Sequence, residues 1–163
     1  MSSVFWYKNA SDIHKRSVHS TKAQKRIKKR EETHKALSDR GFTYEREFRI
    51  KFSSRAERPL SARVDFAVLR SWGHVYVEVD ERQRKPYPEG HDAERMQLIL
   101  AEHMIEGRAG QVHIIRFNPD ACSLNGVRQK LPPKDRVDTL AVVLAYEPVK
   151  QYTITYLYYD RSD

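Results

Sequence analysis

The chain has 163 residues, which is enough for one domain with a hydrophobic core and too few for two comfortable ones. Hydrophobic residues make up 39% of the sequence and charged residues 32%, with a formal net charge of +8. This composition is typical of a globular protein, and its excess positive charge suits a polyanionic partner, either nucleic acid or an anionic membrane surface. No apolar run approaches the roughly 20 residues that span a bilayer, so we expect no membrane partner.

Cysteine content and the N-terminus bear on the cellular compartment. The single cysteine, Cys122, excludes an internal disulfide framework and a cysteine-based zinc site. Residues 1–8 lack the basic-then-apolar layout of a secretory signal. We therefore expect an intracellular protein of the cytoplasm or nucleus.

The first predicted elements are a polar leader over residues 1–20 and a single domain over residues 21–163. Thr21 to Asp39 contains no glycine or proline, its apolar residues recur at helical spacing, and Gly41 follows as a C-terminal cap. Six of the nine residues from Lys22 to Arg30 are lysine or arginine. The start of this helix is therefore strongly basic.

Alternating and helical patterns continue along the chain. They predict, in order, a strand Tyr44–Phe52, a strand Ala62–Leu69, a turn over residues 70–73, a strand His74–Asp80, a helix Asp92–Ile105, a strand Val112–Phe117, a helix Pro132–Tyr146 and a strand Thr153–Tyr159. This order predicts an α/β domain with a mixed central sheet flanked by helices.

Strict alternation also assigns strand faces. In the first strand it places Tyr44 with Phe48, Ile50 and Phe52 on one face. In the second strand it places Ala62 and Val64 on one face with Phe66 and Val68, and Asp65 on the other.

Acidic residues gather on the predicted hairpin. A four-residue loop over residues 70–73 pairs Leu69 with His74, which sets Asp65 across from Glu78, with Asp80 two residues further along. Facing like charges destabilise a sheet. A hard cation such as Mg²⁺ or Mn²⁺, held by carboxylates and a backbone carbonyl, would remove the repulsion and promote phosphodiester hydrolysis. The alternative is that these acids are solvated or paired with lysine and arginine.

Four short motifs occur in a recognisable order. They are Val64-Asp65-Phe66, Val77-Glu78-Val79-Asp80-Glu81-Arg82-Gln83, Asp92-Ala93-Glu94-Arg95-Met96 and Ile115-Arg116-Phe117-Asn118-Pro119-Asp120. Over about residues 30–160 the chain resembles the PD-(D/E)xK nuclease superfamily. The likeness is to the branch related to the very-short-patch repair endonuclease, certain homing-type endonucleases, and nuclease-like proteins of large DNA viruses and algae.

This resemblance implies a restriction-endonuclease-like core and a Mg²⁺-dependent (or Mn²⁺-dependent) endonuclease acting on DNA. Asp65 and Glu78 are then the metal ligands, with the Val79 carbonyl as a third. Superfamily members often add a glutamate from the first helix. Glu31 is the better candidate and Glu32 the weaker one, because Glu31 lies at the edge of the helix's apolar stripe. Glu47 on the first strand is a further, weaker candidate.

Two positions depart from the superfamily pattern. Asp80 stands where many members have lysine, and Arg84 stands where the most similar branch has a histidine that serves as general base or ligand. Arginine stays protonated and cannot act as a base, although it can clamp a phosphate. His74 or His91 would be a substitute base. The departures keep a second interpretation open, a weakened or inactive nucleic-acid-binding member of the same fold.

Basic residues supply the expected contacts to nucleic acid, through salt-sensitive pairing with phosphates. The candidates are Lys22, Lys25, Arg26, Lys29, Arg30, Lys85 and Arg95. A solvated helix face is the alternative for the basic run, and an ion pair with Asp92 is the alternative for Arg95. A ribonuclease with the same site is a third functional interpretation. A homodimer is compatible with double-strand cleavage, since each subunit would then address one strand.

Overall fold

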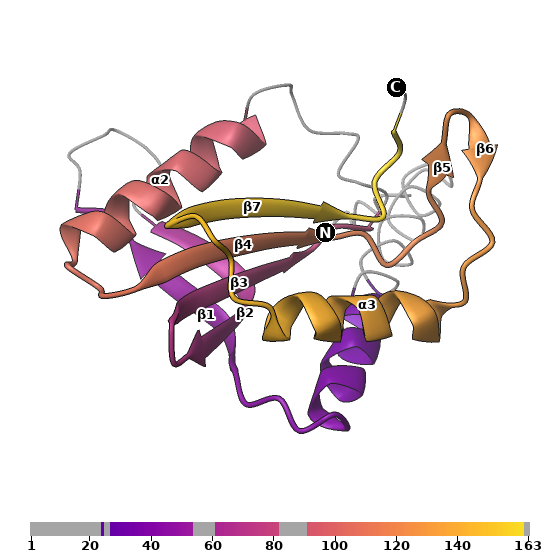
Figure 1. Ribbon diagram of the computed structural model, residues 1–163, viewed down its shortest axis with the longest axis horizontal. Helices are drawn as coiled ribbons and strands as arrows, with labels where there is room; N and C mark the ends of the chain where they lie inside the picture. The colour runs from indigo at the N-terminus through magenta and orange to yellow at the C-terminus, as the bar shows by residue number, and fades with distance from the viewer. Residues whose placement is uncertain (1–23, 25–26, 54–60, 82–90, 162–163) are drawn as a thin grey trace, which may run out of the picture.

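A computed structural model describes residues 24, 27–53, 61–81 and 91–161. These residues form a three-layer α/β arrangement around a five-stranded mixed sheet with strand order β1-β2-β3-β4-β7 (Figure 1). The strands are β1 (Glu45–Lys51), β2 (Ser61–Arg70), β3 (Gly73–Val79), β4 (Gln111–Phe117) and β7 (Tyr152–Leu157). The predicted α/β class and mixed sheet are confirmed.

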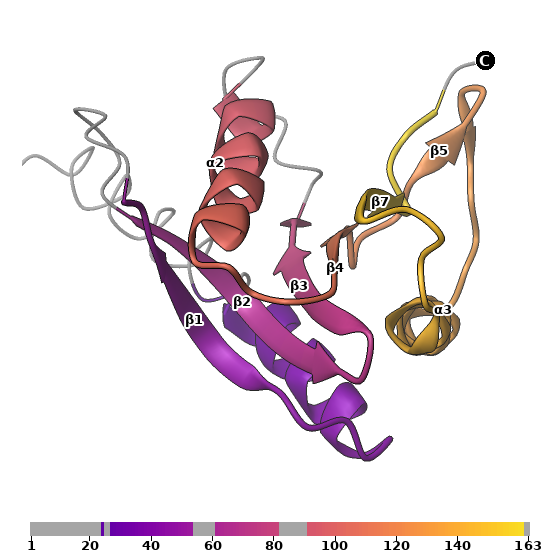
Figure 2. The same ribbon diagram turned by 60° about the vertical axis from the view of Figure 1, so that its left-hand side comes forward.

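Helices cover both faces of the sheet. Helix α2 (His91–Ile105) lies over one face, and α3 (Pro133–Ala145) lies over the other together with an N-terminal helix over residues 27–38 (Figures 1 and 2). Pro133 opens α3 at a position where its missing N–H costs no helical hydrogen bond. The predicted helices are therefore present within the described residues, with the ends that can be compared shifted by at most one position, and the predicted start at Thr21 lies outside the described residues.

Two hydrophobic clusters fill the layers. The α3-side cluster contains Leu140 and Leu144 of α3, Leu37 of the N-terminal helix and the odd-numbered valines of β3. The α2-side cluster contains Met96 and Ile99 of α2, packed on Tyr76 and on residues of β1, β2 and β4. Successive residues of β3 thus alternate between the two clusters, as a strand covered on both faces requires.

The β2–β3 hairpin is tighter than predicted. Leu69 pairs with His74, as expected, but Arg70 pairs with Gly73 as well, so the loop is Ser71-Trp72 rather than four residues. Gly73 suits the end of this turn, because a Cβ there would lie 2.0 Å from the backbone carbonyl oxygen of Gln111 on β4. The predicted register survives because shortening a hairpin loop by one residue on each strand does not shift the pairing.

The predicted strand faces are wrong at two places. Tyr44 packs in the α3-side cluster, whereas Phe48 and Ile50 belong to the α2-side cluster. The reason is Glu47, whose φ of 51° breaks the alternation of β1 between them. β2 changes in the same way, since Val64 packs on the α2 side and Phe66 on the α3 side.

One element lies outside the prediction. After β4, the chain forms a two-stranded sheet of β5 (Ser123–Leu124) and β6 (Val127–Arg128), closed by Asn125 and Gly126 with positive φ. Strands of two residues carry no recognisable alternation, so the Asn-Gly turn is their sole signal in the sequence. The predicted element order therefore lacks this hairpin between β4 and α3.

Candidate active site

Asp65 lies where the β2–β3 pairing ends. That pairing runs from Arg70–Gly73 to Phe66–Val77, and Asp65 is the next residue of β2. Its Oδ2 accepts a hydrogen bond of 2.8 Å from the backbone N–H of Val79. A side-chain oxygen thus joins the two strands at this point, and it holds Asp65 against the backbone that directly follows Glu78.

Arg30 of the N-terminal helix links Asp65 to a second acid. Its Nη1 lies 3.2 Å from Asp65 Oδ1 and also pairs with Glu47. Arg46–Phe66 and Phe48–Val64 pair on either side of Glu47, which therefore lies opposite Asp65 on the neighbouring strand. One guanidinium group accordingly bridges acids of β1 and β2.

Charge and burial compete at this bridge. Burial alone would raise the pKa of the Glu47 carboxyl, but hydrogen bonds and charge from Arg63 and Arg30 outweigh it, so this pKa lies below its usual value. Burial likewise opposes the charge of Arg30, yet Asp65 and Glu47 raise the pKa of its guanidinium. Both partners therefore stay ionised at neutral pH.

Glu78 is approached from the other layer. It is only 2% exposed, and Arg95 of α2 places Nη2 2.5 Å from its Oε1. Arg95 also donates to the backbone carbonyl of Arg63. Arg95 therefore faces the predicted site and pairs with Glu78, while the side chain of Asp92, its partner in the alternative, is outside the described part of the chain.

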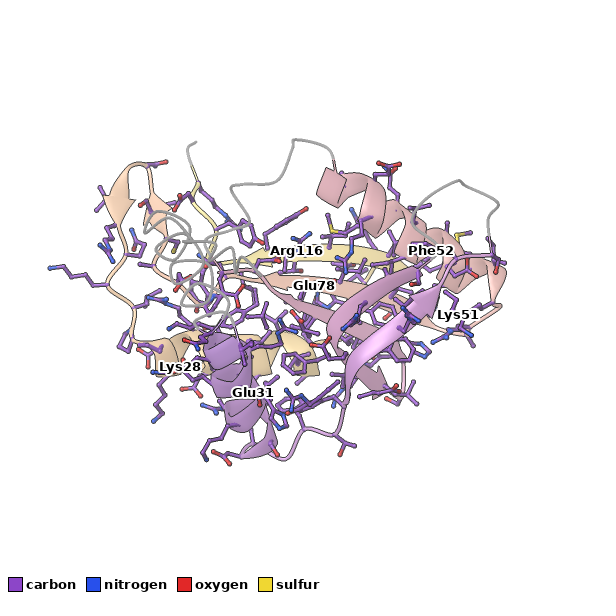
Figure 3. All side chains as sticks on the ribbon, turned by 180° about the vertical axis from the view of Figure 1, so that it is seen from behind. Lys28, Glu31, Lys51, Phe52, Glu78 and Arg116 are labelled. Atoms are coloured by element: carbon purple, nitrogen blue, oxygen red, sulfur yellow. The ribbon has the colours of Figure 1, made fainter. Side chains whose placement is uncertain are left out.

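Asp80 belongs to a buried pair beneath α2. It is fully buried, it is ion-paired with Arg116 of β4, and its Oδ2 accepts a 2.6 Å hydrogen bond from the Tyr159 hydroxyl. Arg116 sits beside Glu78 in the β3–β4 register, and Figure 3 labels the two on these neighbouring strands. Asp80 thus has a structural counter-ion, which explains why an acid is tolerated there.

Other predicted residues lie elsewhere. Glu31 pairs with Arg46 on β1, and Figure 3 shows it on the N-terminal helix, apart from Glu78. Lys29 lies 3.7 Å from Glu32, near the surface of the same helix. The positions of Lys22, Lys25, Arg26, Arg84 and Lys85 are outside the described residues.

The proposed substitute base His74 is also placed away from the acids. Its ring packs edge-to-face on His103 of α2, with ring centroids 4.9 Å apart. The side chain of His91, the other candidate, is outside the described part of the chain. Neither histidine is therefore assigned as the general base that would activate water.

Sequence reasoning misses three contacts of this site. It predicts that Arg30 contacts nucleic acid but not Asp65, and it indicates no contact of Arg116 or Tyr159 with Asp80. Arg116 carries a usable signal, because a charge inside the apolar run of β4 implies a buried partner. The contacts of Arg30 and Tyr159 depend on how distant elements pack, which no spacing in the sequence shows.

A cleft of about 270 Å³ lies between the N-terminal helix and α3. Lys29 and Thr33 line one wall, and Pro133 and Val137 line the other, with Phe117 of β4 among the lining residues. Phe117 belongs to the α3-side cluster, so the cleft lies across the sheet from α2, which carries Arg95. It is therefore separate from the Glu78 carboxylate.

The donor chemistry fits a hard cation. Asp65, Glu78 and the Val79 carbonyl offer oxygen atoms, the ligands that Mg²⁺ and Mn²⁺ prefer. Within the described ranges, no group of three or more histidine, cysteine, aspartate or glutamate side chains is arranged to hold a metal. A cation here would therefore depend on two carboxylates, a backbone carbonyl and water.

Comparisons with models of protein families, with curated proteins and with solved structures give no match for this chain. Among the helices of the described residues, none is long and apolar enough to cross a membrane.

Proposed function

We propose that this protein is a metal-dependent endonuclease that hydrolyses phosphodiester bonds in DNA. The observation that carries the proposal is the 2.8 Å hydrogen bond that joins the Asp65 carboxylate to the Val79 amide, directly after Glu78. This bond holds the Asp65 carboxylate beside the backbone that follows Glu78, at one end of the strand pair. The net charge of +8 supports a polyanionic substrate.

Asp65, Glu78 and the Val79 carbonyl would hold the cation, Mg²⁺ or Mn²⁺. When bound, such an ion supplies an activated water and stabilises charge on the scissile phosphate. The resemblance to the PD-(D/E)xK superfamily assigns the same three groups. No residue beyond these is needed to complete the donor set, since Mg²⁺ usually keeps several waters.

Arg30 and Arg95 are the phosphate contacts in this proposal. Each guanidinium pairs with a site carboxylate, and a phosphate oxygen is an equivalent anionic partner that guanidinium groups bind in a bidentate manner. When a cation neutralises the acids, both arginines can turn to the substrate without leaving a carboxylate uncompensated. They come from helices on opposite faces of the sheet, so they would grip the DNA backbone from two sides.

Plasmid cleavage tests the proposal. Purified protein with Mg²⁺ or Mn²⁺ is expected to nick or cut supercoiled DNA, and Asp65→Asn or Glu78→Gln to reduce the rate at least about 100-fold, some 2.7 kcal/mol in activation free energy. Asp39→Asn is the matched control, because Asp39 is exposed and pairs only with Lys35 in the described contacts. Intact plasmid under all these conditions would reject the nuclease.

A second function has its own supporting observation. Arginine partners stand at Asp65, Glu78 and Asp80, an arrangement that compensates these acids without a metal. A non-catalytic nucleic-acid-binding member of the fold would bind DNA in a salt-dependent manner that EDTA does not alter. Titration of the protein with Mn²⁺, followed by electron paramagnetic resonance, separates the two. Offering matched RNA and DNA strands distinguishes a ribonuclease.

A further inference from the structure

β7 is an edge strand without the usual protection of an edge. It pairs with β4 on one side, and it is the last strand of the sheet as the structure describes it. The six residues of β7, from Tyr152 to Leu157, include no charge, no proline and no glycine, and the positive φ of Tyr158 lies just after the strand. Exposed strands of this kind pair readily with another strand, and natural proteins usually block them with charges, prolines or bulges.

The opposite edge of the sheet shows that blocking. Five of the seven residues of β1 are charged, and Glu47 interrupts the strand with its positive φ. In Figure 1, by contrast, β7 faces the viewer, and no described helix or strand lies in front of it. The two edges of one sheet are thus built differently, and only β1 is built to stay unpaired.

The backbone of β7 has hydrogen-bonding groups to offer. The carbonyl of Gln151, just before β7, and that of Leu157 accept hydrogen bonds from the N–H groups of Val112 and Asn118. Successive residues of a strand alternate sides, so the odd-numbered residues bond to the β4 side. Tyr152, Ile154 and Tyr156 therefore direct their N–H and C=O groups away from the sheet.

Apolar side chains are exposed on β7 and on the part of the chain that precedes it. Ile154 and Tyr156 are 38% and 41% exposed on β7 itself. Val142, Tyr146 and Val149, at the end of α3 and in the segment leading into β7, are more exposed still. An edge pairing alone buries little, and these side chains add area toward the roughly 800 Å² per partner of a stable interface.

We propose that β7 pairs with β7 of a second copy of this chain, antiparallel and about a two-fold axis, so that the two sheets become one. An antiparallel pair sets the start of one strand beside the end of the other. Lys150, just before β7, then approaches Asp160 of the second copy, and opposite charges flank the uncharged centre. The same surface is self-complementary, as a two-fold interface requires. This inference does not depend on the proposed nuclease activity.

Sedimentation velocity over a concentration series tests the pairing. The full-length chain is expected to dimerise reversibly, and Ile154→Lys to raise the dimer Kd at least about tenfold, because lysine is a common edge-blocking residue. Leu69→Lys is the matched control: Leu69 is 73% exposed on β2 and should leave the Kd unchanged. Circular dichroism checks that each variant is folded.

A covalent readout makes the register testable. Thr155 lies on the two-fold axis when Lys150 faces Asp160, so Thr155→Cys is expected to form a disulfide-linked dimer under an added oxidant, whereas Leu69→Cys should not. A wild-type chain that stays monomeric at all soluble concentrations overturns the proposal. So does a dimer that Ile154→Lys weakens no more than Leu69→Lys does.

Discussion

Asp80 and Arg116 form the most deeply buried of the ion pairs seen in the described chain, with side chains 0% and 1% exposed. Removing water from two charges is costly, and their mutual attraction offsets that cost only while both are present. Tyr159 adds a hydrogen bond to the same carboxylate oxygen. The two charges are therefore tolerated in the interior only together, and removing either one destabilises the fold.

Arg116→Met should lower the free energy of unfolding by about 3 to 5 kcal/mol, because the variant removes the arginine that pairs with a buried carboxylate. Urea denaturation measures the loss. Asp80→Leu combined with Arg116→Met should recover most of it. Arg46→Met, which removes a partly exposed ion pair with Glu31, should cost at most about 1 kcal/mol. Equal losses from the two single arginine variants would contradict a structural role for the buried pair.

At the scale of elements, the contact between α2 and the start of β3 brings together two histidines, His103 and His74, whose pKa values are lowered. Burial, reinforced by the charges of His74 and Arg108, lowers the pKa of His103 to about 4, although Glu106 acts in the opposite sense. The aromatic ring of Tyr76 also packs on His103. Burial lowers the pKa of His74 too, with Arg108 acting in the same direction.

Protein stability should therefore fall as pH drops from about 6.5, the ordinary histidine pKa, towards 4. In this window the unfolded chain binds a proton that the folded His103 does not, so the free energy of unfolding decreases with falling pH. His103→Leu should flatten the dependence, measured by urea denaturation at successive pH values. Met104→Leu, at the exposed neighbouring position, should retain it. An unchanged slope in His103→Leu would assign the dependence to other groups.

Gly110, just before β4, lies against the β2–β3 turn at Trp72, which is a second contact between elements. Gly110 has a φ of 94°, and a Cβ there would lie 2.4 Å from the Trp72 carbonyl oxygen, a backbone atom that cannot move aside. Gly110→Ala should cost about 2 to 4 kcal/mol of stability in urea denaturation. Gly126→Ala is the control, because Gly126 has a φ of 77° with open space around it. It should show only the backbone strain, about 1 to 2 kcal/mol.

Most elements could be predicted from the sequence because strands and helices covered on one or both faces leave a regular apolar pattern. The register of the central hairpin was predicted from the position of the turn. The turn has two residues rather than the predicted four, which leaves the pairing of Leu69 with His74 unchanged. The change of face in β1 and β2 could not be predicted. In β1 it depends on the positive φ of Glu47, and glutamate is not a residue type that favours a positive φ.

At the scale of the whole molecule, the candidate site was predictable in part. Asp65 and the Glu78–Val79 strand end could be placed together from the sequence, because they are neighbours in a local hairpin. The arginine partners of Asp65, Glu78 and Asp80 could not, since Arg30, Arg95 and Arg116 come from three other elements, distant in the sequence. Sequence pattern therefore located the acids, and only the packed structure locates the charges that compensate them.

The basic N-terminal helix should contribute to DNA affinity by neutralising backbone phosphates. Under the proposed function, the DNA-binding constant K falls as salt rises. Replacing Lys28 and Lys29 together by alanine should make the negative slope of log K against log salt shallower by about 2, since each neutralised phosphate contributes about 0.9. Fluorescence anisotropy over a salt series measures it. Lys150→Ala, just before β7, should leave the slope unchanged. If the double lysine variant and Lys150→Ala showed the same salt slope, DNA would not bind at the N-terminal helix.

The buried Asp80–Arg116 pair also constrains how this sequence can change over generations. A substitution at either position removes one partner of a buried ion pair and is costly, whereas replacing both residues by apolar ones is tolerated. Selection should therefore remove single changes and accept coupled ones. Descendants of this chain are expected to carry both charges or neither, and the two positions, 36 residues apart in sequence, should vary as one.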